Sequence, residues 1–224
     1  MLKFQNGDKI LFTGDSVTDA GRGRPIGEGL WDGVGTGYVR SIDTLLNVCY
    51  PEILLHICNT GTSGNTSRDL CARWQSEVLD LEPDYLVLCI GFNDVWRQFD
   101  SPACRNQQVM PEEYRRNLGR MIASAKPKVK ELILMTPYYM EPCREDRMRA
   151  RMDEYRAVML ETAKENGLYC IDLQKEFDDY LQYRHSSYLT CGGCISSSSL
   201  CWKNTLSGIF CRSTKSFLTF ISCS

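Results

Sequence analysis

The chain has 224 residues, enough for one domain with a complete hydrophobic core. Its formal net charge of −2 gives no reason to expect nucleic acid or an anionic membrane as a partner. The residues before Ile10 lack the apolar core of a signal peptide, and no run approaches the roughly 18 apolar residues of a membrane-spanning helix. We therefore expect a cytoplasmic protein that binds neither nucleic acid nor a membrane.

The first predicted strand ends in a serine turn. Residues 10–12 form a short apolar run typical of a buried strand, and Gly14-Asp15-Ser16 then breaks the strand and can start a helix. A serine at such a turn lies at the carboxyl edge of a sheet, where α/β proteins keep their sites. Its hydroxyl can act as a nucleophile beside backbone N–H groups that bind a developing oxyanion. The same triplet also occurs as an ordinary turn.

A glycine-rich loop follows, from Gly21 to Gly37. It contains the letters of a dinucleotide-binding loop, but no strand leads directly into it and no helix opens within it. A lid or a substrate-contacting loop beside Ser16 is the favoured interpretation. Apolar residues at helical spacing then predict a helix between Tyr38 and Val48.

Two further predicted strands end in small or amide residues. The stretch 55–66 is a strand that runs into a turn containing Gly64, and this turn opens another helix. The stretch 85–94 is a strand with Asn93 just past its end. Because the carboxyl ends of parallel strands meet at one edge of a sheet, we expect Ser16, Gly64 and Asn93 to converge there.

The rest of the chain continues the alternation of strand and helix. Strands are predicted at 131–137 and 168–173, and helices at 110–126, 145–166 and 174–183. Five alternations of strand and helix are typical of an open, doubly wound sheet. We predict one α/β domain over residues 1–189, with a five-stranded parallel sheet flanked by helices.

The three strand-end blocks resemble those of the SGNH hydrolases, also called the GDSL esterase/lipase family. Gly14-Asp15-Ser16 matches the first block, Gly64 the glycine of the second, and Gly91-Phe92-Asn93-Asp94 the third. The resemblance covers roughly residues 8–189 and implies a flavodoxin-like fold with strand order 2-1-3-4-5. It also implies an ester hydrolase without a cofactor or metal.

The same resemblance implies roles for three residues. Ser16 would be the nucleophile, and the oxyanion would be held by the N–H groups of Ser16 and Gly64 and by the side-chain amide of Asn93. The alternative is that Gly64 and Asn93 only form loops.

The family's Asp-x-x-His pair is absent from the printed sequence. In the family, the histidine deprotonates the serine and the aspartate orients the imidazole. Here the last carboxylate is Asp179. Of the two histidines, His56 lies within the second predicted strand as a core or edge residue. His185 comes shortly before the expected position and has no acid near it in sequence.

Residues 190–224 differ in composition from the rest of the chain. Five of the twelve cysteines lie there, beside a run of four serines. If the codons of residues 191–195 are read two bases later, they permit the sequence Arg-Val-His. This is the position at which the family carries its histidine. We therefore interpret this segment as a frameshifted tail that replaces the family's final helix and packs poorly. The alternatives are a zinc clip begun by Cys191 and Cys194, and a disulfide-rich extension that needs an oxidising compartment.

These features predict a serine ester hydrolase that forms an acyl-enzyme on Ser16, with activity impaired by the missing pair. An acetylated carbohydrate or another short-chain ester is the expected substrate, because Trp31, Trp96 and Arg97 suit a polar acyl carrier. Trp96 and Arg97 could equally cover helix ends. The competing hypotheses are a non-catalytic binding protein that retains the pocket and, from the glycine loop alone, a nucleotide-binding domain. The sequence does not indicate an oligomeric state.

Overall fold

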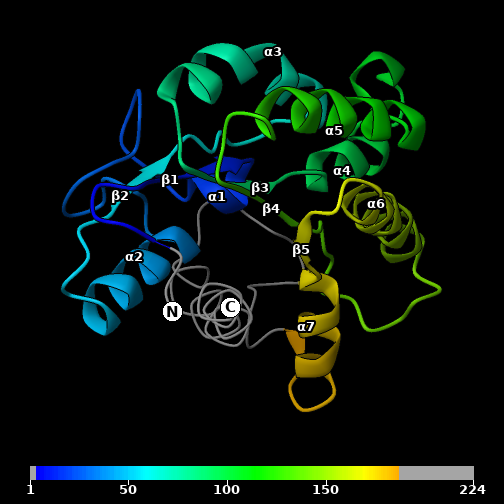
Figure 1. Ribbon diagram of the computed structural model, residues 1–224. Coiled ribbons are helices and arrows are strands. Elements are labelled where there is room, and N and C mark those ends of the chain that lie inside the picture. Colours follow the sequence, from blue (N-terminus) through cyan, green and yellow to red (C-terminus); the bar gives the residue numbers. More distant parts are fainter. Residues whose placement is uncertain (1–3, 187–224) are drawn as a thin grey trace.

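The computed structural model describes residues 4–186, and its core is one five-stranded parallel sheet (Figure 1). The strand order is β2-β1-β3-β4-β5, which confirms the order implied by the family resemblance. The strands are β1 (Lys9–Gly14), β2 (His56–Asn59), β3 (Tyr85–Cys89), β4 (Glu131–Met135) and β5 (Tyr169–Ile171). All four pairings are parallel, so every strand ends at the same edge of the sheet.

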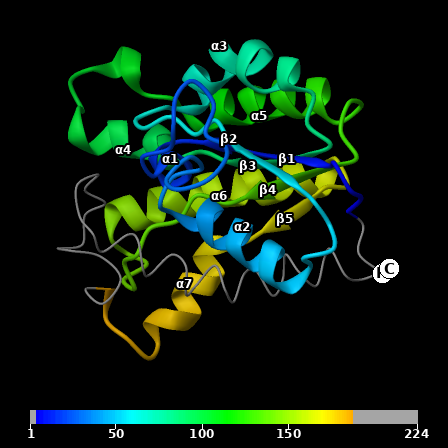
Figure 2. The same cartoon turned by 90° about the vertical axis from the view of Figure 1, so that its left-hand side faces the viewer.

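Helices cover both faces of this sheet, as Figures 1 and 2 show. The helices are α1 (Ser16–Asp19), α2 (Tyr38–Cys49), α3 (Ser67–Glu77), α4 (Phe92–Asp100), α5 (Pro111–Ala125), α6 (Arg147–Glu165) and α7 (Leu173–Leu181), with short 3₁₀ turns η1 (Leu79–Leu81) and η2 (Arg105–Gln107). Helices α3 to α6 pack on one face, and α2 and α7 pack on the other. The α/β layer arrangement expected from the sequence is confirmed.

The central parts of the strands are apolar because both of their faces are buried. Leu11, Leu86 and Leu134 point into the core beneath α3 to α6. Phe12 and Val87 alternate with them and point into the core beneath α2 and α7. This explains why the strands appear in the sequence as continuous apolar runs rather than as alternating patterns.

Gly14 lets the first strand approach the third at the point where the serine turn begins. The register pairs Gly14 with Cys89, and a Cβ atom on residue 14 would lie only 2.0 Å from the Cys89 carbonyl oxygen. No side chain fits at that separation, so a glycine is required. The close contact fixes the height at which the chain leaves β1 and delivers Ser16 to the sheet edge.

Most predicted elements agree with the observed ones to within a few residues. Strand β4 ends at Met135, two residues before its predicted end at Pro137. Strand β5 begins one residue later and ends two residues earlier than predicted. Helix α4 was not predicted. Within the described part of the chain, no helix combines the length and apolarity needed to cross a membrane. The predicted tail, residues 190–224, and the expected loss of a final helix lie outside the described residues.

Candidate functional site

The serine turn is held by the residue before it. Asp15 is the N-cap of α1, and its carboxylate accepts a hydrogen bond from the Val17 N–H at 3.0 Å. Ser16 is the first residue of α1, so its N–H has no acceptor within the helix. Across residues 4–186, no side chain hydrogen-bonds to the Ser16 hydroxyl. The turn therefore presents a half-buried hydroxyl and a free N–H on the same residue.

The second turn leaves one backbone donor without an acceptor. Gly64 adopts φ +82°, a left-handed conformation that favours glycine. On one side the Ser63 N–H donates to Asp19 Oδ2 at 2.9 Å, and on the other the Asn65 N–H donates to the Thr62 carbonyl at 3.2 Å. Among the described residues, nothing accepts from the Gly64 N–H between them.

Asn93 lies in the first turn of α4, directly after β3. Its side chain is buried, and its Nδ2 donates to the Asn65 carbonyl at 2.9 Å. An amide nitrogen carries two hydrogens, so this bond fixes the orientation of the amide and leaves its second hydrogen without an acceptor among the described residues. Gly91 makes the sharp entry into α4 possible with φ +130°, where a side chain would collide with the Tyr114 hydroxyl.

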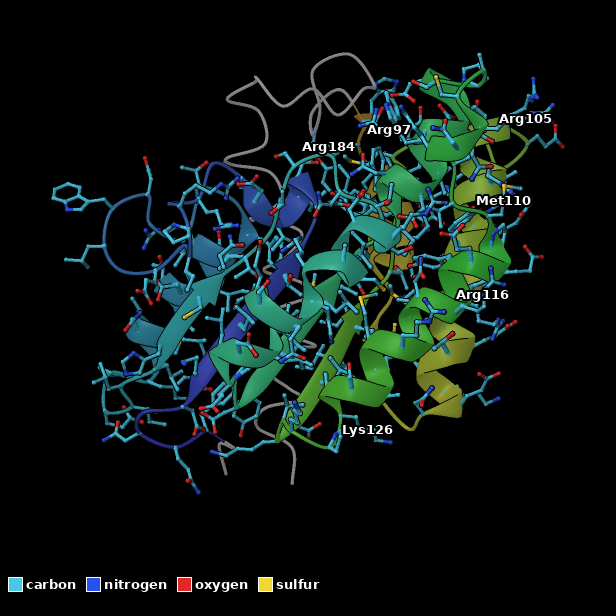
Figure 3. The ribbon with its side chains drawn as sticks, turned by 90° about the horizontal axis from the view of Figure 1, so that it is seen from above. Arg97, Arg105, Met110, Arg116, Lys126 and Arg184 are labelled. Carbon is cyan, nitrogen blue, oxygen red and sulfur yellow. The ribbon has the colours of Figure 1, made fainter. Side chains whose placement is uncertain are left out.

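Backbone hydrogen bonds draw the strand ends together. The Thr62 N–H donates to the Gly14 carbonyl at 3.0 Å, which joins the Gly64 turn to the end of β1. The Asn93 to Asn65 bond joins the same turn to the start of α4. Ser16, Gly64 and Asn93 thus all lie at the carboxyl edge of the sheet. In Figure 3 this is the end of the molecule marked by Arg97, opposite Lys126.

The aromatic and cationic residues expected around the site differ in their placement. The Arg97 guanidinium lies 3.7 Å from the position that a Cβ on Gly64 would take, and it forms an ion pair with Asp100. Trp96 stacks on Phe92 with ring centroids 5.7 Å apart. Trp31 is 90% exposed at the glycine-rich loop. Arg97 therefore adjoins the Gly64 turn, whereas Trp96 packs against its own helix.

The glycine-rich loop packs against the second turn. The buried Arg22 side chain donates to the Gly61 carbonyl at 2.7 Å, and Gly27 forms an antiparallel bridge with Asn59. Arg24 forms an ion pair with Asp19 at 2.7 Å. These contacts tie the loop to the segment that follows β2, in keeping with the expectation of a loop beside the site.

Neither histidine hydrogen-bonds to the Ser16 hydroxyl. His56 is exposed at the start of the edge strand β2, which resolves the alternatives for it in favour of an edge residue. His185 is exposed after α7. Two acids of the α7 region, Asp172 and Asp178, are held by arginines and are not free to support an imidazole: Asp172 by Arg156 at 2.6 Å and Asp178 by Arg149 at 2.8 Å. In residues 4–186, no cluster of three or more His, Cys, Asp or Glu could hold a metal ion.

Two buried carboxyls stand beneath the site. Burial raises the pKa of Asp94 to about 7, although the Ser67 hydroxyl and N–H donate to this carboxylate. Burial also raises the pKa of Asp15 to about 7, and the nearby Asp94 charge adds to the effect. Both acids bind protons more tightly in the folded chain than in the unfolded chain.

This linkage predicts that the contribution of Asp94 to stability is greatest in acid. Between pH 4 and 7 the unfolded chain has largely lost the Asp94 proton while the folded chain retains it, so the contribution of this group to the free energy of unfolding falls as the pH rises. Asp94→Asn removes the titration. Between pH 4 and 7 we expect the free energy of unfolding of wild type to fall by ~1–3 kcal/mol relative to that of Asp94→Asn, measured by urea unfolding. A difference that does not change with pH would contradict a raised pKa for Asp94.

Two supporting residues of the site were not identified from the sequence. Asp94 follows Asn93 and binds Ser67, the first residue of α3. Arg73 of α3 reaches the ends of β1 and β2. The sequence pattern could have identified Arg73, because this residue lies between Leu70 and Trp74 on the buried side of α3. A charged residue in such a place needs several partners.

Comparison with known proteins relates this geometry to a family. Residues 12–192 match the GDSL-like lipase/acylhydrolase family. An acetylxylan esterase from Geobacillus stearothermophilus is 44% identical over 181 residues, which are 81% of this chain and 83% of that protein.

Solved structures agree with this relationship. LAE5, an alpha/beta hydrolase enzyme from the metagenome of Lake Arreo in Spain, is 44% identical with a TM-score of 0.88, over 96% of this chain and 98% of its own. Axe2, an acetylxylan esterase from Geobacillus stearothermophilus, is 40% identical with a TM-score of 0.87, over 94% of this chain and 95% of its own. Three of its catalytic mutants replace a serine, an aspartate and a histidine with alanine.

The family match spans most of the chain, and the identity to the acetylxylan esterase is well above what a shared fold alone produces. The blocks at the three strand ends stand where the family resemblance expected them. The chain therefore belongs to the GDSL-like lipase/acylhydrolase family, the SGNH carboxylic ester hydrolases.

Proposed function

We propose that this chain is a serine ester hydrolase for acetylated carbohydrate, with Ser16 as the nucleophile and with Gly64 and Asn93 as oxyanion donors. The observation that carries the proposal is a set of three donors at one sheet edge that have no acceptor within residues 4–186: the Ser16 N–H, the Gly64 N–H and the second hydrogen of the Asn93 amide. Similarity to an acetylxylan esterase supports acetyl groups on a sugar as the substrate class.

The proposed reaction proceeds through an acyl-enzyme. Ser16 Oγ attacks the ester carbonyl, and the three donors bind the negative oxygen of the tetrahedral intermediate. The ester C–O bond breaks and the sugar alcohol leaves with a proton. Water then attacks the acyl group on Ser16, which releases acetate and restores the hydroxyl. A base must take the serine proton in the first step and return it to the alcohol.

We propose that activity is impaired because that base is missing. The printed sequence contains no carboxylate after Asp179, so it holds no Asp-x-x-His pair at the family's position. We infer that the hydrolase domain covers residues 1–189 and that residues 190–224 are a frameshifted tail. Sequencing the coding DNA around codons 185–200 tests this: a continuous, unshifted frame in independent clones would contradict it.

We further propose that the protein works in the cytoplasm. All seven cysteines in the described part of the chain are free thiols, and three of them are exposed. Free exposed thiols suit a reducing compartment, where disulfides are rare. Localisation of a tagged full-length chain by fractionation tests this proposal.

The absence of a base also favours a second candidate, a binding protein that retains the pocket without chemistry. Labelling with a fluorophosphonate distinguishes the two, because this reagent reacts with an activated serine. A hydrolase is expected to be labelled at Ser16, slowly here, and Ser16→Ala is expected to abolish the label. Binding of acetylated xylo-oligosaccharide without any label, measured by calorimetry, would favour the binding protein.

A further inference from the structure

Arg73 of α3 occupies an unusual position for a charged side chain. Only 13% of the side chain is exposed, and it is directed at the carboxyl ends of β1 and β2. Among the described residues its carboxylate partner is Glu77, 2.8 Å away on the same helix. A guanidinium at this depth loses much of its hydration, so the bonds that replace the water must be well made.

The bonds of Arg73 connect three segments that the proposed mechanism needs. Nη2 donates to the Gly14 carbonyl at 3.0 Å, two residues before Ser16. Nη1 donates to the Thr60 carbonyl at 2.7 Å, at the end of the second strand. Nε donates to Asn65 Oδ1 at 2.7 Å. Asn65 directly follows Gly64.

Asn65 is therefore held from two sides. Its side chain accepts from Arg73, and its carbonyl accepts from the Asn93 amide at 2.9 Å. Both anchors are on Asn65, the residue directly after Gly64, so they hold one side of the turn that sets the direction of the Gly64 N–H. Donors that stabilise an oxyanion must be correctly placed before the reaction begins.

We propose that Arg73 is a positioning residue for the oxyanion site, which fixes the Gly64 turn relative to the serine turn and to Asn93. This inference rests on the proposed function. Arg73 itself touches no reacting atom. The planar fork of a guanidinium lets one side chain reach acceptors on three segments, which the single nitrogen of a lysine cannot do.

Arg68 provides a matched control on the same helix. It also bonds to one carboxylate, Glu113, and to two backbone carbonyls, those of Asn106 and Gln108. Those acceptors lie toward α5 and not at the strand ends. Arg68→Gln therefore removes the same charge and the same kind of bonds from α3 without touching the Gly64 turn.

The test uses the full chain and needs no catalysis. Gly64 and Asn65 are observed by ¹⁵N NMR, and methylphosphonate, a tetrahedral anion that carries a methyl group, is titrated as a probe of the oxyanion site. In Arg73→Gln we expect a displaced Gly64 amide resonance, about tenfold faster hydrogen exchange at the Asn65 N–H, and about tenfold weaker methylphosphonate binding. Asn93→Ala should weaken binding similarly, and Arg68→Gln should match wild type in all three measurements.

Two further variants keep the test decisive. Arg73→Lys should not restore the wild-type values, because lysine keeps the charge but lacks the planar guanidinium that reaches all three segments. If Arg73→Gln fails to fold, Asn65→Ala removes only the link between Arg73 and the turn and should give the same displacement of Gly64.

The outcomes separate the two proposals. An unchanged Gly64 amide in Arg73→Gln and Asn65→Ala, or equal effects of Arg68→Gln, would overturn the positioning role. Wild type that does not bind methylphosphonate, or that binds it without a change at Gly64, would count against the proposed oxyanion site. A displaced turn in Arg73→Gln would in that case still show that Arg73 holds Gly64.

Discussion

Hydrolysis of p-nitrophenyl acetate by this chain is expected to exceed the spontaneous rate only slightly, and Ser16→Ala is expected to change it little. The proposed loss of the general base leaves the Ser16 hydroxyl with its proton and makes it a poor nucleophile. Loss of the histidine from a serine hydrolase triad costs on the order of 10⁶ in turnover, and what remains comes from the oxyanion site and substrate binding. The rate is measured at high enzyme concentration against a heat-treated control.

A restored reading frame should reverse this result. A chain that carries Trp-Asp-Arg-Val-His-Pro and the helix beyond it in place of residues from about 190 onward should regain most of the lost factor, on the order of 10⁶. That activity should disappear in Ser16→Ala. The matched control is the same restored chain with its new histidine changed to alanine.

His185 is the residue that could contradict this expectation. It lies near the end of the described chain and does not hydrogen-bond to Ser16. The acids Asp172 and Asp178 form bidentate pairs with Arg156 and Arg149, so neither is free to orient an imidazole. Strong esterase activity of the chain as printed, abolished by His185→Ala, would show that His185 is the base.

The strands could be predicted from the sequence because each is a short apolar run followed by a turn. Strand β3, with all five residues buried, is the clearest case. The order of the strands could not be read from periodicity, since any arrangement of buried parallel strands gives the same apolar runs. It came from the family resemblance. Helix α4 was missed because Gly91 starts it without a side-chain cap, so the usual signal of a helix start is absent.

The placement of the candidate site residues at one sheet edge was predictable where a residue type is tied to its backbone position. Ser16, Gly64 and Asn93 follow strand ends in small-residue turns, and parallel strands bring such turns to one edge. The contacts that hold the turns were not predictable, because they join residues distant in sequence. Asp94 and Ser67 are 27 positions apart, and Arg73 and Gly14 are 59 apart. Nothing local in α3 indicates which carbonyls its arginine will reach.

The largest expected effect on stability is that of Arg149, which joins α6 to α7. Its side chain is 1% exposed. It makes a bidentate pair with Asp178 of α7, at 2.9 and 2.8 Å, and donates to Asp153 at 3.0 Å and to the Glu141 carbonyl at 2.6 Å. Helix α7 is the last helix in the described part of the chain, and this network holds it to α6.

We expect Arg149→Met to lower the free energy of unfolding by about 3 kcal/mol, because it removes the buried guanidinium and leaves Asp178 with only Gln174 and the more distant Arg144. The control is Arg115→Met, which removes an arginine that is 40% exposed and paired with Glu161 and Glu165. That change should cost no more than about 1 kcal/mol, as is usual for exposed ion pairs. Urea unfolding followed by circular dichroism measures both. In the double variant Arg149→Met/Asp178→Met, part of the loss should be recovered, since the Asp178 carboxylate that has lost its bidentate partner is then removed as well. Equal costs for Arg149→Met and Arg115→Met would mean that burial adds nothing to the Arg149 network and that α7 is held by its apolar contacts alone.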